Sequence, residues 1–506
     1  MLLLSALVVG SFVGCFKAAG FSPSSFVRSS RLTYRRRLRY FNYVQLSAGT
    51  TTKDIPTMID GPDHFDVIIV GSGLVGSAIA AGLVERGLLS ASHCNIKVYE
   101  KRNEMQRVGA AIGLYPNGRT ALRYLCPQVD DYVQQWAIPS RYFERRDLQD
   151  NVLQVTDVQQ LQTTTSPVYF PWYLLQQKLL DAVPSDSIIE YGKTFDSYRV
   201  QPDGTVRVSF TTSSLSPGTS SSSLESTTTT VSCRVLIGAD GIFSAVRKQL
   251  LNETRIPLHY YGKVMYRAVF SRPDPDNLIQ ALSNNSAGYL YCPPPGTQIS
   301  YQGDTSGQSF SFRETAPGIM TITAAARLSG EPSIWQQYDP QFRKQRFQGL
   351  FAEYPKAVQD IIKSLNVDSI HEDYVRDVTI PSFWSDGPVV ICGDAAHAMT
   401  PYMGQGANMG LEDASVLVHL LEPLLQKEMQ TNNEKGALEI TKALAKFQRI
   451  RMERVTRVQE QSRRNAIQSS SFDKESAAVP FVRRKYTKQF QADLYDWSAP
   501  TNEYRI

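Results

Sequence analysis

Cysteine is scarce in this sequence, with six residues among 506. They are widely spaced, without a Cys-x-x-Cys pair and without histidine at ligand spacing. A disulfide framework needs paired cysteines, and a zinc site needs clustered cysteine and histidine ligands. The sequence therefore excludes both, and no metal site is expected. Beyond Cys15, in an N-terminal apolar run, we expect core thiols in a reducing compartment; these are Cys94, Cys126, Cys233, Cys292 and Cys392.

Acidic residues are absent from the first 53 positions, which hold eight of the 53 lysines and arginines. The rest of the chain carries 45 basic and 48 acidic side chains, so the net charge of +5 comes entirely from this N-terminal segment. A slightly acidic body lacks the basic surface that nucleic acid or an anionic membrane attracts. No nucleic-acid partner is expected.

The apolar run at the N-terminus, Leu2–Phe16, is too short for a comfortable membrane span. With the small residues after it, it predicts a signal peptide over residues 1–20. Residues 21–60 are rich in Ser and Arg, which predicts a transit peptide or linker. Together, with Phe21 at the new N-terminus, they resemble the bipartite presequences of proteins imported into plastids of secondary origin. The alternative is an ER or secreted protein, and no integral span is expected in the mature chain.

A glycine-rich turn between a strand and a helix follows. Phe65–Val70 is a β-branched apolar run, typical of a strand buried on both faces. The next residues form a Gly-x-Gly-x-x-Gly motif, Gly71-Ser72-Gly73-Leu74-Val75-Gly76. Gly71 permits the tight turn, Gly73 lets a pyrophosphate approach the backbone, and Gly76 lets the helix pack on the strand. The helix that starts here points its N–H groups at the phosphates.

Glu100 ends the next strand, Ile96–Glu100, where a carboxylate suits the hydroxyl groups of a ribose. Lys101 and Arg107 lie on the segment that would run beside the cofactor. A lone glycine motif is a weak indication. A strand before it, a helix after it and an acid at this distance make it a strong one for dinucleotide binding. The alternative is a glycine turn in another α/β unit.

Two more turns of this kind follow later in the chain. Strand Val235–Ile237 leads into Gly238–Arg247, which contains Asp240-Gly241. Strand Pro388–Cys392 leads into Gly393-Asp394 and, after Pro401, into a helix that begins near Asn408. Acids and glycines at the carboxyl ends of parallel strands lie where nucleotides bind. Glycines before a helix form a nest of N–H groups that attracts anions; here the sequence is Gly404-Gln405-Gly406-Ala407-Asn408.

These three motifs, in this order and at this spacing, resemble the single-component (class A) FAD-dependent monooxygenases, which include aromatic-ring hydroxylases and carotenoid epoxidases. The likeness covers nearly all of residues 64–465. It implies that the first motif binds the ADP half of FAD, and that Asp240-Gly241 with Arg247 serves FAD and a passing nicotinamide cofactor. It further implies that Asp394 holds the ribityl chain and that Pro401 and Gly404–Asn408 lie beside the flavin ring.

The resemblance gives the fold class as α/β, a Rossmann-like FAD-binding domain with an inserted β-rich substrate domain and C-terminal helices. Alternating strands punctuated by turns support the insertion. A Ser- and Thr-rich run at 212–230 is expected to be a flexible hairpin-loop extension. The predicted parts are 64–260 and 381–468 for the FAD-binding domain with its C-terminal helices, 261–380 for the substrate domain, and 469–506 for an uninformative tail.

The function implied by this resemblance is a monooxygenase that uses NAD(P)H and O₂. It would hydroxylate or epoxidise a small aromatic, apolar or isoprenoid substrate through a C4a-hydroperoxyflavin, shielded from water by the β-rich domain. A second Gly-x-Gly-x-x-Gly is absent, which agrees with transient NAD(P)H binding. The alternatives are a flavin reductase or oxidase of the same fold, similar to geranylgeranyl reductases, and a non-catalytic flavin-binding protein.

Several residues near the motifs leave the assignment open. Trp172 stands where many members carry an Arg, which puts one flavin contact in doubt. His397 is either a catalytic base or a structural residue of its turn, so no catalytic residue is assigned. Tyr266, Arg267 and Tyr402 are candidates to line the substrate site, and ordinary sheet packing is the alternative for the first two.

Overall fold

The structure is a computed structural model, and it describes residues 63–88, 95–107, 109, 111–158, 167–215, 224–253, 258–272, 293–303, 308–328, 339–426, 434–468 and 488–501. The targeting segments predicted within residues 1–60 lie outside the described residues and stay predictions. One of the alternating strands that the sequence predicts for the inserted domain, around residues 288–292, lies outside them too. In the described part, no helix combines the length and apolarity that crossing a membrane requires.

The first sheet is built around three parallel strands that each precede one of the glycine motifs. Neighbours pair in the order β16-β17-β10-β1-β2-β7, with β8 and β9 joined to β10. Apolar residues fill both faces of its centre, as expected for parallel strands between helices. The strands are β1 (His64–Val70), β2 (Ile96–Glu100), β7 (Ile189–Tyr191), β8 (Thr194–Val200), β9 (Val206–Leu215), β10 (Leu224–Gly238), β16 (Ser385–Asp386) and β17 (Val389–Ile391).

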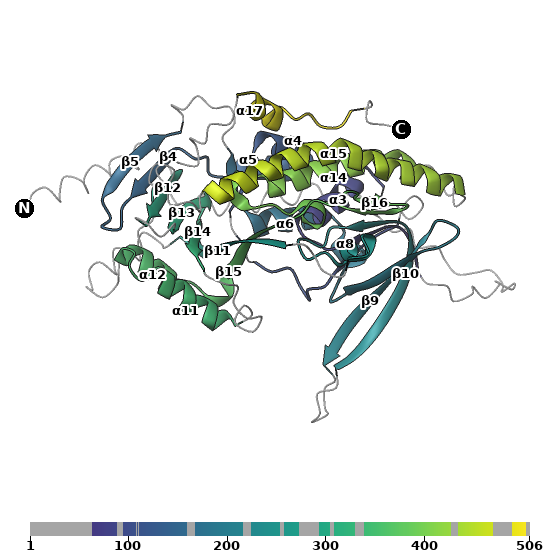
Figure 1. Cartoon of the computed structure of the whole chain (residues 1–506), viewed down its shortest axis with the longest axis horizontal. Coiled ribbons are helices and arrows are strands. Elements are labelled where there is room, and N and C mark those ends of the chain that lie inside the picture. The colour runs from purple at the N-terminus through teal and green to yellow at the C-terminus, as the bar shows by residue number, and fades with distance from the viewer. Residues whose placement is uncertain are drawn as a thin grey trace, which may run out of the picture. The chain divides into compact units, whose positions relative to one another are not determined.

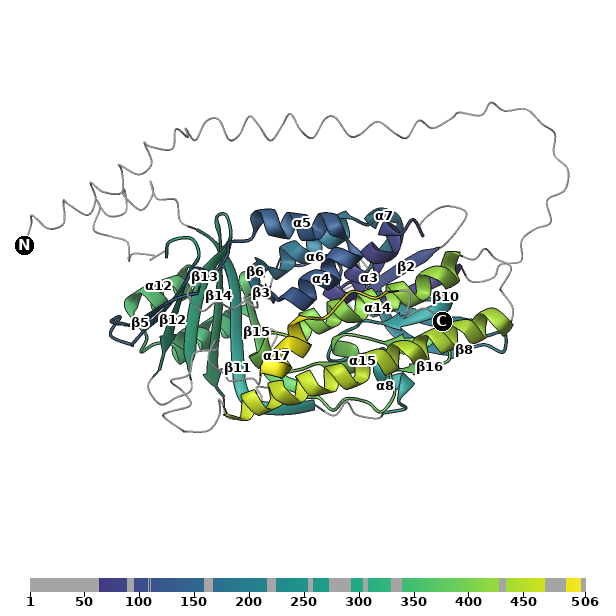
Figure 2. The ribbon, with the colours of Figure 1, turned by 90° about the horizontal axis from the view of Figure 1, so that it is seen from above.

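Helices α3 (Leu74–Glu85) and α14 (Gly406–Gln426) pack against each other in the core of this part (Figure 2). Both are apolar around most of their circumference, which is typical of buried helices. Gly82 makes their close approach possible, since a Cβ there would lie 3.2 Å from Val418 of α14. The other helices are α4 (Pro116–Leu125), α5 (Pro127–Trp136), α6 (Trp172–Asp181), α7 (Ser185–Ile188), α8 (Ala245–Leu250), α13 (Asp394–His397), α15 (Glu434–Gln468) and α17 (Lys488–Tyr495).

The hairpin predicted for the Ser- and Thr-rich run is present, and its strands reach further into the run than expected. Strands β9 and β10 pair antiparallel as far as Leu215 and Leu224, so the described part of the run forms a long hairpin that projects beyond the sheet (Figure 1). The physical reason is that threonine is β-branched and favours strands. Low sequence complexity therefore did not mean absence of structure here.

The second sheet has seven strands in the order β15-β11-β14-β13-β12-β4-β5. Its presence beside the first sheet confirms the predicted fold class. Strands β4 and β5 come from the region assigned by sequence to the FAD-binding part, yet β4 pairs in parallel with β12. The strands are β4 (Tyr142–Arg146), β5 (Val152–Asp157), β11 (Leu258–Ser271), β12 (Thr297–Gln302), β13 (Ser309–Ala316), β14 (Ile319–Arg327) and β15 (Ile370–Val378).

One face of the second sheet is apolar and the other polar. Strand register places Tyr266, Ala324 and Phe310 in one row, and all three are buried. Two helices that the sequence analysis did not expect, α11 (Pro340–Leu350) and α12 (Lys356–Ser364), cover this face through Phe347 and its neighbours. The opposite face carries the alternate residues of the same strands, among them Arg267 and Arg313.

A substitution at Phe347 tests whether α11 stabilises the second sheet. The Phe347 ring stacks on Tyr266 at 4.3 Å and is fully buried. Replacing Phe347 with Ala leaves a cavity, so we expect the free energy of unfolding to fall by about 3–5 kcal/mol in urea denaturation. Leu153→Ala, at a 53% exposed position of β5, is the control and should change it by less than about 0.5 kcal/mol. Equal effects of the two variants would contradict this account of the core.

Candidate functional site

The three glycine motifs meet at one edge of the first sheet. Val70 pairs with Gly238, and Gly238 with Ile391, so the carboxyl ends of β1, β10 and β17 lie side by side. A Cβ on Gly71, where φ is +99°, would lie 2.7 Å from the carbonyl oxygen of Ala239. The first two motifs therefore touch. In open parallel sheets this edge is where ligands bind.

The first motif leaves room at its centre. A Cβ on Gly73 would meet no atom within 4 Å, whereas one on Gly76 would lie 2.0 Å from the carbonyl oxygen of Gly71. No side chain caps the first turn of α3, which begins at Leu74, so its N–H groups face that open space. Val75 packs against the third motif, 2.8 Å from the position of a Cβ on Gly393.

Glu100 is held in place by the first motif itself. Its Oε2 accepts hydrogen bonds from the backbone N (2.8 Å) and Oγ (3.1 Å) of Ser72, and its Oε1 from the N of Arg102 (3.0 Å). A carboxylate has about four acceptor positions, so capacity remains for a ribose hydroxyl. Lys101 next to it is exposed.

Arg107 is exposed and lies beside Tyr173 of α6. The two line a cavity of about 190 Å³ together with Val269 of β11 and Ile319 of β14. Trp172, one residue before Tyr173, packs over Gly109, where a Cβ would lie 2.7 Å from the indole. The position of the family's arginine is therefore filled by a packed aromatic ring.

The second motif uses its charged side chains within the protein. Asp240 accepts from Ser244 Oγ (2.5 Å) and from the backbone N of Ala245 (2.7 Å), so it caps α8 after the turn at Gly241. Burial raises its pKa. Arg247 is 1% exposed and donates to the carbonyl oxygen of Ala395 at 2.8 Å. The Arg247 side chain thus ties the second motif to the third.

Asp394 begins α13 directly after Gly393. Its side chain is exposed, while the surrounding protein raises its pKa against the opposing effect of His397. The carboxylate is therefore open to solvent. Asp373 and Arg267 of the second sheet also act on it electrostatically, so that sheet lies near Asp394.

The third motif continues through a short 3₁₀ helix, η3 (Pro401–Met403), to α14. Gln405 and Asn408 are fully buried, and Asn408 joins α14 to the segment before α4, since its Oδ1 accepts from the N of Tyr115 at 3.0 Å. The backbone at Gly404, Gly406 and Ala407 is partly open. The N-terminus of α14 carries free N–H groups and the positive end of the helix dipole, so an anion is favoured there.

The residues expected to line the substrate site are separated by the structure. Tyr266 faces the core under α11, which is the sheet packing given as its alternative, because successive residues of a strand point to opposite faces. Arg267 lies on the polar face, with its Nη1 2.6 Å from Asp373 Oδ2. The hydroxyl oxygen of Tyr402 accepts a hydrogen bond from Lys263 Nζ of β11 at 3.1 Å, so the third motif contacts the second sheet.

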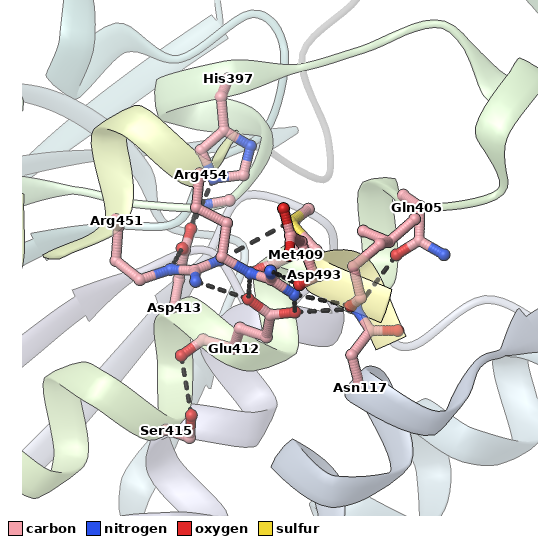
Figure 3. A network of polar contacts seen from close by, with 12 residues as sticks. Asn117, His397, Gln405, Met409, Glu412, Asp413, Ser415, Arg451, Arg454 and Asp493 are labelled. Atoms are coloured by element: carbon pink, nitrogen blue, oxygen red, sulfur yellow. Dashed lines mark hydrogen bonds and ion pairs between the residues drawn. The ribbon is translucent and has the colours of Figure 1, made fainter. Parts of the chain in front are cut away.

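A buried network of charges supports the third motif (Figure 3). Asp413 of α14 accepts at Oδ2 from the N of Gly393 (2.9 Å) and lies 2.5 Å from His397 Nε2. Its Oδ1 accepts from Arg451 Nε of α15 (2.7 Å). His397 is fully buried against Trp384, 5.2 Å between ring centroids, which favours the structural alternative for this residue.

Glu412 completes the network beside Asp413. Its Oε2 accepts from Arg451 Nη1 (2.5 Å) and Arg454 Nε (2.7 Å), and its Oε1 from Asn117 of α4 (2.8 Å). Two carboxylates thus balance two guanidinium groups inside the protein. Asn117 also donates to Gln405 at 3.0 Å, which joins the network to the glycine loop.

The sequence analysis missed the aromatic residues beside this loop. Tyr115 lies 3.1 Å from the position of a Cβ on Gly404, and Tyr495 of α17 stacks on Tyr115 at 5.4 Å. The tail that sequence found uninformative therefore reaches the candidate site. Nothing in the composition of the tail indicated a role for Tyr495. Tyr115 did have a local signal, because it stands directly before Pro116, the residue at which α4 begins.

A dinucleotide cofactor fits this edge of the sheet. The open space at Gly73, the free N-termini of α3 and α14 and the solvent-open carboxylate of Asp394 are the groups that would receive phosphates, flavin and ribityl hydroxyls. The second sheet approaches from the side of Tyr402. In the described ranges, no group of three His, Cys, Asp or Glu is arranged to hold a metal ion.

Comparison with known sequences points to flavin chemistry. A family model described as an FAD binding domain matches residues 214–433. The 6-methylsalicylate 1-monooxygenase of Aspergillus terreus is 26% identical over 413 residues, which cover 79% of this chain and 82% of that protein. The 6-hydroxynicotinate 3-monooxygenase of Pseudomonas fluorescens is 26% identical, covering 83% of this chain and 97% of that protein.

Solved structures show the same fold. HpxO of Klebsiella pneumoniae, complexed with FAD and uric acid, has a TM-score of 0.62 at 22% identity and covers 85% of this chain and 96% of its own. A salicylate hydroxylase substrate complex has a TM-score of 0.55 at 20% identity, with coverage of 86% and 90%. At these identities the similarity concerns the fold.

A substitution at Gly73 tests cofactor binding without disturbing the fold. With φ of −60° and open space around it, the position accepts an alanine. We expect Gly73→Ala to stay folded, with the free energy of unfolding within about 1 kcal/mol of the original since alanine is a poorer N-cap. FAD affinity should fall at least about tenfold, because the methyl group occupies the phosphate space. Fluorescence titration of the FAD-free protein with FAD measures this affinity.

Gly349→Ala is the matched control, since Gly349 in α11 also has open space around it but lies under the second sheet. Its FAD affinity should equal that of the original protein. A Gly73→Ala variant that binds FAD as tightly as Gly349→Ala would refute the placement of the phosphates.

Asp413 makes stability depend on pH. Burial raises its pKa, but His397 and Arg451 outweigh this and hold the pKa below the ordinary value. Its ionised form therefore stabilises the fold above about pH 4, and this contribution is lost as the pH falls toward the lowered pKa. Asp413→Asn leaves Arg451 short of one anionic partner, so at pH 7 we expect a loss of about 3–5 kcal/mol in unfolding free energy.

Urea denaturation at pH 7, 5 and 3.5 checks this prediction. The original protein should lose more stability between pH 5 and 3.5 than Asp413→Asn does. Asp131→Asn, at a side chain 75% exposed on α5, is the control and should follow the original at every pH. Identical pH profiles for the original protein and Asp413→Asn would contradict the role of this carboxylate.

Proposed function

We propose that the chain is an FAD-dependent oxidoreductase similar to the aromatic monooxygenases, and that it uses NAD(P)H and O₂ to hydroxylate a small aromatic compound. The observation that carries the proposal is the convergence of three glycine motifs at one sheet edge, with a second sheet against the third motif. An aromatic substrate is favoured over an isoprenoid one because the relatives' names specify aromatic acids.

Bound FAD would supply the activation of O₂ by its reduced ring. The protein's part is to hold the cofactor and exclude water. The N-terminus of α3 would bind the pyrophosphate, Glu100 the ribose, and Asp394 the ribityl chain. The N–H groups at the start of α14 would stabilise negative charge on the reduced ring.

Water exclusion falls to the second sheet. Its polar face lies toward the third motif, where Lys263 and Tyr402 are 3.1 Å apart. A substrate held between this face and the glycine loop would be shielded from bulk solvent. Transient binding of NAD(P)H agrees with the single Gly-x-Gly-x-x-Gly of the sequence, and the exposed Arg107 is a candidate contact for it.

Coupled turnover with labelled oxygen tests the proposal. The FAD-loaded protein is mixed with NADH or NADPH and with salicylate, 6-hydroxynicotinate or geraniol, and reduced-cofactor loss, H₂O₂ and product mass are measured under ¹⁸O₂. We expect one aromatic compound to stimulate oxidation at least about tenfold and to gain one labelled oxygen atom. Protein stripped of FAD is the control and should be inactive.

The other outcomes identify the rival functions. Oxidation of NAD(P)H with all electrons recovered as H₂O₂ would indicate a flavin reductase or oxidase. FAD binding without any consumption of NAD(P)H would indicate a non-catalytic flavoprotein. Labelled geraniol would retain the monooxygenase but overturn the aromatic substrate.

A further inference from the structure

Helix α17 ends on the guanidinium group of Arg454, a side chain of α15. The Nη1 of Arg454 donates to the carbonyl oxygen of Asp493 at 2.6 Å, and its Nη2 donates to that of Leu494 at 2.8 Å. The last carbonyl groups of a helix have no partner within the helix itself. Arg454 therefore satisfies two of them and holds the end of α17 in place.

The same guanidinium group binds Glu412, the buried carboxylate of α14. Its Nε donates to Oε2 at 2.7 Å and its Nη2 donates to Oε1 at 2.8 Å. All three nitrogens of Arg454 are thus engaged, and one planar group joins a carboxylate to two backbone carbonyls. A lysine ammonium is a compact point charge and cannot span all of these partners.

From Glu412 the hydrogen bonds continue to the glycine loop, Gly404–Asn408. The Oε1 of Glu412 also accepts from Nδ2 of Asn117 at 2.8 Å, and the same Nδ2 donates to Oε1 of Gln405 at 3.0 Å. These three side chains are fully buried, so the low dielectric strengthens the hydrogen bonds between them. A continuous chain of contacts therefore leads from α17 to the loop (Figure 3).

A second route to the loop runs through Tyr495, the last residue of α17. Its ring stacks on that of Tyr115, with 5.4 Å between the centroids and 11° between the planes. The Tyr115 ring lies 3.1 Å from the position of a Cβ on Gly404. The end of α17 is thus connected to Gln405 through hydrogen bonds and to Gly404 through aromatic rings.

Tyr115 is also bound to the far end of the loop. It follows β3 (Ala111–Leu114), which pairs antiparallel with β6 (Val168–Pro171). Its backbone N donates to Oδ1 of Asn408 at 3.0 Å. A displaced Tyr115 would therefore disturb the loop at both of its ends.

Apolar side chains anchor α17 on the core of the first sheet. Leu494 is 2% exposed, and Phe490, which lies four residues earlier on the same helix face, packs against the same core. Trp497, just beyond the helix, packs there too. The helix also lies against α4 (Figure 1). A helix anchored in this way can hold a neighbouring loop in one position.

We propose that α17 positions the glycine loop Gly404–Asn408 for the flavin, with Arg454 and Tyr495 as positioning residues. The arginine acts through Glu412 and the tyrosine through Tyr115. The loop leads into α14, whose N–H groups would stabilise negative charge on the reduced ring. Releasing α17 should therefore weaken FAD binding and make the reduction potential more negative. The proposal concerns the cofactor, so it holds for any substrate.

Substitutions at Tyr495 test this role in the full chain. Tyr495→Ala removes the aromatic stack and leaves the charged network in place. We expect the dissociation constant of FAD, measured by fluorescence titration, to rise at least about fivefold. The reduction potential of the bound FAD, measured by equilibration with reference dyes, should become more negative. Tyr495→Phe keeps the ring and should leave both quantities as in the original protein. Phe383→Ala is the control, since it removes a 38% exposed ring from the segment before β16, and it should also leave both unchanged.

A double variant tests whether the two positioning residues act together. Arg454→Lys keeps a charge beside Glu412 but loses the contacts of the planar fork, so it should change affinity and potential in the same direction. Both routes require α17, so in the double variant with Tyr495→Ala the loss of affinity should be smaller than the product of the single losses. A loss equal to that product would overturn the common role of α17. If Arg454→Lys fails to retain FAD, the comparison of Tyr495→Ala with Tyr495→Phe decides.

Two further results for Tyr495→Ala would overturn the proposal. One is an FAD affinity and a reduction potential that both equal those of the original protein. The other is weaker FAD binding at an unchanged potential, because a general loss of stability accounts for that result. Failure of the proposed function is distinct, since neither measurement uses NAD(P)H or a substrate.

Discussion

The hydrogen bond from the N of Gly393 to Asp413 is the contact on which the candidate site depends. Gly393 stands where β17 ends, at φ of +58°, and a side chain there would collide with Val75 of the first motif. The ionised form of Asp413 binds this backbone most strongly, and His397 together with Arg451 from the long helix α15 favours that form. A distant helix thus fixes the spacing between two glycine loops, and hence the space left for a cofactor.

In this arrangement backbone groups and charged side chains have different roles. Backbone N–H groups at α3 and α14 face the open side, whereas the acidic and basic side chains of the second and third motifs mostly face inward. Asp394 is the exception, because it stays open to solvent. Such a design suits a large anionic cofactor, since fixed dipoles bind phosphate without the entropy that long side chains would lose.

Sequence predicted what depends on local chemistry. The glycine motifs, their strands and the helix at Glu434–Gln468 follow from turn residues and apolar patterns in the sequence. The segments that these elements contact lie nearby in the sequence or at the sheet edge where the glycine motif recurs. It did not predict that Tyr142–Arg146 pairs with β12, because that pairing spans about 150 residues. The sequence does contain a start signal for helix α11, Asp339-Pro340. The prediction missed it because the surrounding segments were assigned to strands. Neighbours Tyr266 and Arg267 could not both line the site, since the strand period is two.

The two arginines of the polar face show why burial has to be read together with charge. Arg267 pairs with Asp373, and the attraction lowers the pKa of that carboxyl despite the burial that opposes it. Their mutual neutralisation leaves little for a ligand to gain. Arg313, by contrast, has hydroxyl, amide and aromatic groups around its guanidinium among the residues that the structure describes. Neutral acceptors and π faces solvate a cation but do not cancel its charge. Burial alone therefore does not tell whether an arginine is neutralised, because the charge of its neighbours decides that.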